Sequence, residues 1–233
     1  MTLNEAAYRI RRFYRTHYKE TDELDIRYVY SWVISTRARL LKQRLDKPMA
    51  TIDNNYVQDL GPVALEQVDS SICRGLPTPL YAYKKIVRTA IEIPPTIDRS
   101  GHTGTFTRIG PADMLTTNFK VLDYDDVFYY GYGKFNGSDI CAFPLENRIY
   151  LYSRSGNHFN MKYIDVRGVF LDPRDAAVIK DPTWDENDEF PMNETLVDDM
   201  ENMIKQEKIL FNIPKDTTSN SSNDIPPTAV VKK

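Results

Sequence analysis

The sequence predicts an α+β protein with an N-terminal helical hairpin, an antiparallel β-rich body, a C-terminal helix and a disordered tail. Apolar residues recur at helical spacing near the N-terminus, and in the middle of the chain they alternate with polar residues, as strands require. Helical spacing returns late in the chain, and the last residues are rich in Ser, Thr, Asn and Pro. The predicted regions are 1–47, 48–172, 173–213 and 214–233.

The first predicted helix starts at a capping box, because Glu5 follows Thr2 by three residues. Its apolar positions, at helical spacing, are Leu3, Ala6, Ala7, Ile10, Phe13 and Tyr14. Much of the remaining surface is occupied by Arg9, Arg11, Arg12 and Arg15. This pattern predicts a basic amphipathic helix, and a short polar connector after it makes a helical hairpin with the next segment.

The segment 24–47 is the strongest single element, and we predict that the rest of the chain is arranged around it. One side of this helix is apolar, with Arg37 and Arg44 in its middle. An arginine at that place needs carboxylate or carbonyl partners, from this chain or a neighbour, because a buried unpaired guanidinium costs roughly 3 to 5 kcal/mol. The opposite side is polar but carries Tyr28 and Trp32 beside Arg39, which indicates a second contact surface.

Strands are expected next, bounded by Gly and Pro. Their predicted ranges are 63–68, 85–93, 105–109, 118–122, 148–153 and 159–166. Asn136-Gly137 predicts a tight hairpin between aromatic strands. A short helix over Pro173 to Ile179 and a longer one from the cap Asn193 to about Leu210 follow.

Net charge is divided between the two ends. Residues 1–47 hold eleven Lys and Arg against six Asp and Glu, a net of +5, whereas 172–233 hold seven against fourteen, a net of −7. Opposite net charges at the two ends suit head-to-tail packing of copies or stacking on a partner of opposite charge. The alternative is that both charged faces are simply exposed to solvent. The tail, 214–233, has too few apolar residues to offset its ordering entropy, so we expect order only against a partner.

Catalytic and metal-binding motifs are missing, so the sequence predicts no enzyme, no cofactor and no metal. The spacing of metal ligands is absent from His17, His102, His158, Cys73 and Cys141, and the acidic turn Asp123, Asp125 and Asp126 lacks the glycine and distal glutamate of a calcium loop. Residues 129–135 superficially resemble the aromatic strands on which RNA bases stack, but an Asn-Gly hairpin with core aromatics explains them without a ligand. No apolar run suits a membrane span and no signal peptide is evident, which favours a soluble cytoplasmic protein without a membrane partner.

Several segments together resemble structural proteins of crAss-like bacteriophages. They read MTLNEAAYRI, YSWVISTRARLLKQ, NYVQDLGPVALEQVD, IVRTAIEIP, TRIGP and YIDVRGVFLDPRDAA, within residues 1–210. These relatives form ring or adaptor proteins of the head-to-tail connector. The resemblance implies a homo-oligomeric ring of twelve copies in the virion neck or tail, assembled in the host cytoplasm and touching the portal or an adjacent ring. Packaged double-stranded DNA would pass through it without sequence-specific contacts.

The candidate interface or DNA-facing residues are Arg9, Arg11, Arg12, Arg15, Trp32, Arg37, Arg39 and Arg44. One alternative is a nucleic-acid-binding module that uses the basic N-terminal helices. A second alternative is a small enzyme without a recognisable motif.

Overall fold

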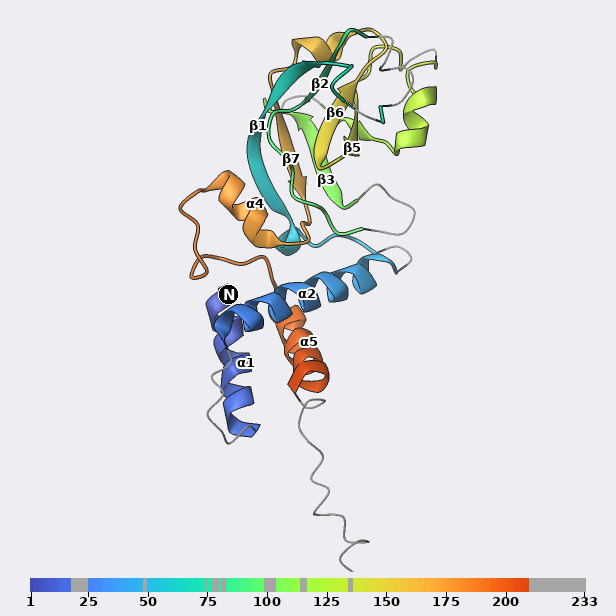
Figure 1. Ribbon diagram of the computed structural model, residues 1–233. Helices are drawn as coiled ribbons and strands as arrows, with labels where there is room; N and C mark the ends of the chain where they lie inside the picture. The colour runs from blue at the N-terminus through green and yellow to red at the C-terminus, as the bar shows by residue number, and fades with distance from the viewer. Residues whose placement is uncertain are drawn as a thin grey trace, which may run out of the picture.

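The computed structural model describes residues 1–17, 25–47, 50–73, 75–76, 80, 83–98, 104–113, 117–133 and 136–209. The structure has two units, a curled β-sheet body and a helical unit built from both ends of the described chain (Figure 1). The helical unit consists of α1 (Leu3–His17), α2 (Ile26–Leu45) and α5 (Glu194–Ile204). Helix α2 lies between the β body and the other two helices (Figure 1).

Side-chain caps define where these helices begin. The predicted capping box is confirmed, because Glu5 N donates to Thr2 Oγ1 at 3.1 Å and Thr2 N donates to Glu5 Oε2 at 2.9 Å. Asp25 accepts from Arg27 N at 2.9 Å at the start of α2. The predicted cap Asn193 accepts from Leu196 N at 2.9 Å and starts α5, which continues into a π-helical segment, η4 (Lys205–Ile209).

The three helices share one apolar core, so the first and last regions of the sequence fold together. Helix α2 lies across the start of α1, where the Tyr30 hydroxyl bonds Asn4 Oδ1 (Figure 1). Helix α5 packs on both, and residues of the body close the core from above. The buried members include Leu3, Ala6, Ile10, Val29, Val33, Leu41, Tyr56, Val169, Phe190, Leu196, Met200 and Ile204.

Among the described residues, the β body is one seven-stranded sheet with the order β3-β7-β1-β2-β6-β5-β4. The strands are β1 (Gln58–Asp69), β2 (Lys85–Thr89), β3 (Phe106–Pro111), β4 (Lys120–Val121), β5 (Cys141–Leu145), β6 (Arg148–Tyr152) and β7 (Tyr163–Gly168). Neighbours are antiparallel, except that β4 runs parallel to β5. Phe119 N donates to Ile109 O at 2.7 Å, so the two edges of the sheet meet and the body is a partly closed barrel. The predicted α+β class is confirmed.

The sheet is buried on both faces where β2, β5 and β6 lie side by side. In β6, Ile149 and Leu151 point into the barrel core, and Tyr150 and Tyr152 point into a second cluster outside it. That outer cluster contains Val127 of η2 (Tyr124–Tyr129), a 3-10 helix that covers the sheet. Two further 3-10 helices, η1 (Asn54–Tyr56) and η3 (Asn157–Asn160), and α4 (Pro173–Lys180), which packs on β1, complete the body.

The predicted hairpin at Asn136-Gly137 is wrong. The aromatic segment before it forms η2 rather than a strand, and only the segment after it is a strand. The tight hairpin instead joins β5 to β6 through Glu146 and Asn147, with φ of 50° and 58°. Positive φ at both turn positions matches the twist of the flanking strands.

Other predicted strands differ in length. The strand predicted at 85–93 ends at Thr89, and β1 is longer than the predicted 63–68. The stretch 159–166 divides into the end of η3 and β7. The hairpin connector, His102 and the tail 214–233 lie outside the described residues.

Candidate assembly surfaces

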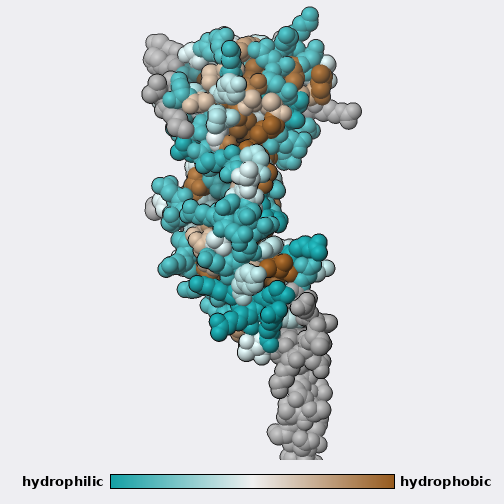
Figure 2. All heavy atoms as spheres, turned by 90° about the vertical axis from the view of Figure 1, so that its left-hand side faces the viewer, coloured by the Kyte–Doolittle hydropathy of each residue, from teal (hydrophilic) through white to brown (hydrophobic). Residues whose placement is uncertain are grey.

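The exposed face of α1 carries a cluster of arginines, which we call the arginine ridge: Arg11, Arg12 and Arg15. With Tyr8 and Thr16 these residues line a shallow hollow of about 260 Å³. Arg12 and Arg15 are exposed, Arg11 is partly buried, and Tyr8 is 59% exposed. Within the described residues none of the three arginines forms an ion pair. This end of the molecule is largely hydrophilic (Figure 2).

The other candidate arginines on the helices are paired with acidic residues near the C-terminal end of the described chain. Arg9 lies 3.5 Å from Glu201. Arg39 lies 2.7 Å from Glu207, and Arg44 lies 2.7 Å from Asp199. The opposite charges of the two ends therefore meet inside one protomer, and these pairs do not require head-to-tail contacts between copies.

Arg37 is the most deeply buried of the candidates, with none of its surface exposed, which confirms its predicted place in the apolar stripe. Its Nε donates to Pro191 O and its Nη1 to Phe170 O, both at 3.1 Å. The guanidinium also lies 5.7 Å from the centre of the Phe190 ring. Burial lowers the pKa of Arg37 to about 9, opposed by the charge of Asp172. Arg37 therefore connects α2 to the backbone on either side of α4, and it is not exposed on the surface of the protomer.

Arg44 differs from its prediction. One third of its side chain is exposed, because it lies at the edge of the helical core and reaches outward to Asp199. Its second contact is the hydroxyl of Tyr56, at 3.1 Å. Trp32 is partly buried against the helical core, so the exposed aromatic on this face of α2 is Tyr28, at 64%.

His17, His158, Cys73 and Cys141 lie in the described part of the chain. No group of three or more His, Cys, Asp and Glu there could hold a metal ion. His158 is buried beside Phe159, its Nδ1 accepts from Ser153 N at 3.1 Å, and burial lowers its pKa to about 4. Burial raises the pKa of Cys141 to about 12, which keeps this thiol neutral. No helix among the described residues is long and apolar enough to cross a bilayer.

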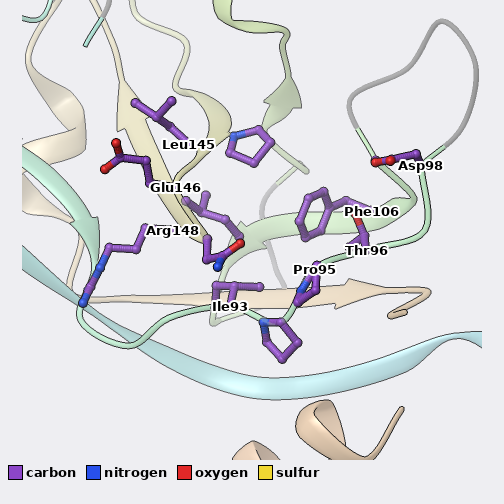
Figure 3. Close-up of a pocket in the computed structure, with 13 residues that line it drawn as sticks. Ile93, Pro95, Thr96, Asp98, Phe106, Leu145, Glu146 and Arg148 are labelled. Carbon is purple, nitrogen blue, oxygen red and sulfur yellow. The ribbon is translucent and has the colours of Figure 1, made fainter. Parts of the chain in front are cut away.

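A second surface that the sequence did not indicate is a groove of about 330 Å³ in the β body (Figure 3). It lies where the barrel is open beside the hairpin of β5 and β6, and we call it the barrel seam. Its apolar lining includes Ile93, Pro95, Phe106, Leu145 and Ile149. Asp98 and Glu146 stand at opposite ends of it (Figure 3). The sequence signal was Pro144 inside a strand, because proline within a sheet marks an open edge.

The two surfaces described above are a hollow lined by arginines on α1 and a largely apolar groove in the β body. One protein family, described as phage tail ring protein 2, has a sequence model that matches residues 5–225. The chain is therefore a structural protein of the class of crAss-like phage ring proteins, as the resemblance implied. Within this class it belongs to the phage tail ring protein 2 family. The comparison with curated proteins gives no match.

Proposed function

We propose that the chain forms a homo-oligomeric ring of twelve copies in the head-to-tail connector of the phage. The observation that carries this proposal is the family match over residues 5–225, because a ring protein must associate with itself. The neighbours in this proposal are the portal protein or an adjacent connector or tail ring, and double-stranded DNA passes through the channel. The role is structural and non-enzymatic, in a virion neck that is assembled in the host cytoplasm.

The chemistry of the two ends of the molecule supports a subunit that meets different partners above and below. The helical end presents the arginine ridge and the exposed Tyr28. Helix η2 lies in the β body, away from the helical unit (Figure 1). It carries the exposed aromatic Tyr129, at 81%, and Tyr132, three residues further along the chain, is 65% exposed. Exposed aromatic residues are enriched at protein interfaces, whereas arginines serve both interfaces and phosphates.

The arginine ridge also favours a second candidate, a nucleic-acid-binding module. Three arginines without ion pairs among the described residues can neutralise phosphates of any sequence. In the ring proposal the same residues face the channel DNA. Salt dependence tests both: each phosphate contact contributes about −0.9 to the slope of log affinity against log salt concentration. If the affinity for DNA does not change with salt concentration, the arginine ridge does not bind phosphates.

The ring itself is tested by measuring the mass of the purified full-length protein, alone and mixed with the purified portal protein. The proposal predicts a discrete species of many copies in at least one of the two samples. A strictly monomeric protein that binds neither the portal nor any other isolated connector protein would overturn it.

A further inference from the structure

The barrel seam exists because β4 is too short to cover its neighbour. The two residues of β4 pair with β5 only at Cys141 and Ala142. Beyond them, the part of β5 that reaches Leu145 pairs with β6 on one side and has no strand on its β4 side in the described structure. Phe106 of β3 lies across the gap (Figure 3). An extended peptide could therefore lie where β4 would continue.

The lining of the seam specifies what such a peptide should contain. Its floor is apolar, so the peptide needs apolar side chains. Asp98 and Glu146 are negative, and the positive Arg148 is already engaged, since its Nη1 donates to Thr89 O at 2.7 Å and Ala90 O at 2.9 Å. The seam is therefore suited to an extended apolar peptide with positive charge at one end.

The last ten residues of this chain, DIPPTAVVKK, have that chemistry. Val230 and Val231 are β-branched, a residue type that favours extended structure, and the preceding Pro226-Pro227 has the same preference. Lys232 and Lys233 follow, and they could pair with the carboxylates of the seam. The described structure ends at residue 209, and 210–233 can span about 80 Å when extended at roughly 3.3 to 3.6 Å per residue.

We propose that the seam of one copy binds residues 225–233 of a neighbouring copy. This inference rests on the proposed ring, in which every copy has other copies of the same chain as neighbours. Helix α5 and η4 carry the chain away from its own β body (Figure 1). The described chain therefore ends on the side of the molecule that is remote from its own seam. Because each copy has one tail and one seam, the exchange is heterologous and can close a ring.

Apolar packing and charge supply most of this contact. Pro144 has no N–H, so β5 offers the docked peptide only a carbonyl at that position and a full strand ladder cannot form. The same proline prevents uncontrolled edge pairing of the body with other strands. The seam is thereby selective for a peptide whose side chains fit its lining.

The test is disulfide cross-linking between two full-length variants, Leu145→Cys and Val230→Cys. A disulfide requires Cα atoms roughly 4.4 to 6.8 Å apart, and the native Cys73 and Cys141 are buried. Mixing the two variants under oxidising conditions should give a dimer-sized product that neither gives alone. Val230→Cys mixed with Lys162→Cys, an exposed position elsewhere on the body, is the matched control and should give none. If the mixture of Leu145→Cys and Val230→Cys gives no dimer-sized product, the exchange is refuted.

Charge supplies the second arm of the test. Lys232→Glu with Lys233→Glu in the Val230→Cys chain should lose most of the cross-linked product. Glu146→Lys with Asp98→Lys in the Leu145→Cys chain should restore it. No restoration would refute the charge pairing. Mass measurement separates this inference from the proposed function, because intact rings without cross-links refute the exchange alone, whereas a monomeric wild type refutes the ring.

Discussion

Replacing Arg37 with alanine should destabilise the protein more than replacing any other candidate arginine. The guanidinium donates to two backbone carbonyls, Pro191 O and Phe170 O, and its side chain is fully buried. Alanine would leave both carbonyls without that donor and would open a cavity beside Phe190. Because these carbonyls belong to the segments before and after α4, the loss should loosen the junction between the helical unit and the β body.

The expected loss of unfolding free energy for Arg37→Ala is about 3 kcal/mol, within a range of roughly 2 to 5. In a chain of this size 1 kcal/mol corresponds to about 2 to 4 °C, so the melting temperature should fall by roughly 6 to 12 °C. Arg37→Met is the matched control: it keeps most of the volume and removes the buried charge, so it should cost less than alanine. Arg44→Ala should cost only about 1 kcal/mol, because that arginine is partly exposed.

Thermal melting followed by circular dichroism measures all three variants. If Arg37→Ala melts with the wild type while Arg44→Ala melts far below it, the helical phase assigned to α2 is wrong. The two carbonyl contacts of Arg37 would then not be part of the stable fold.

Three further outcomes are expected. Arg11→Glu with Arg15→Glu should fold normally and lose salt-sensitive docking to DNA or to a connector partner, because both arginines lie on the outer side of α1. The stability that depends on neutral His158 should be complete above pH 6.5 and lost as pH falls towards 4, since the unfolded chain is protonated first. In His158→Gln, the melting temperature should therefore fall less steeply between pH 6.5 and 4 than it does in the wild type. Deleting 214–233 should leave the melting temperature of the separated protomer nearly unchanged and lower the yield of rings.

Each of these outcomes has a clear contradiction. If the protein with Arg11→Glu and Arg15→Glu is unfolded, the two arginines contribute to the core and not to an outer surface. An unchanged acid limb in His158→Gln would mean that another group controls acid stability. A truncated protein that aggregates or melts many degrees lower would show that the tail belongs to the folded core.

The helices were predicted well because their signals are local. A capping box needs only Thr2 and Glu5, and the place of Arg37 in the apolar stripe follows from helical spacing alone. The failures came from long-range packing. The pairing of Arg44 with Asp199 joins residues far apart in the sequence, so spacing could not reveal it. The opposite net charges of the two ends were visible in the sequence, but the three ion pairs between these ends within one chain were not.

The β body shows where local signals mislead. Asn136-Gly137 is the standard hairpin dipeptide, yet the tight hairpin uses Glu146-Asn147. The pairing of β5 with β6 imposes a positive φ on Glu146, a residue type that rarely adopts it, so the local sequence does not reveal this turn. The aromatic run before Asn136 has strand propensity, but it forms η2 and inserts Val127 into the outer cluster of the sheet. The barrel seam depends on how early β4 ends, which only the three-dimensional pairing defines.

The most direct test of the central claim is electron microscopy of the purified full-length protein, alone and on the isolated portal, with projection averages calculated without imposed symmetry. The account predicts closed rings with a central channel and twelve-fold views along the axis. Fields of single, asymmetric particles in both samples would contradict it.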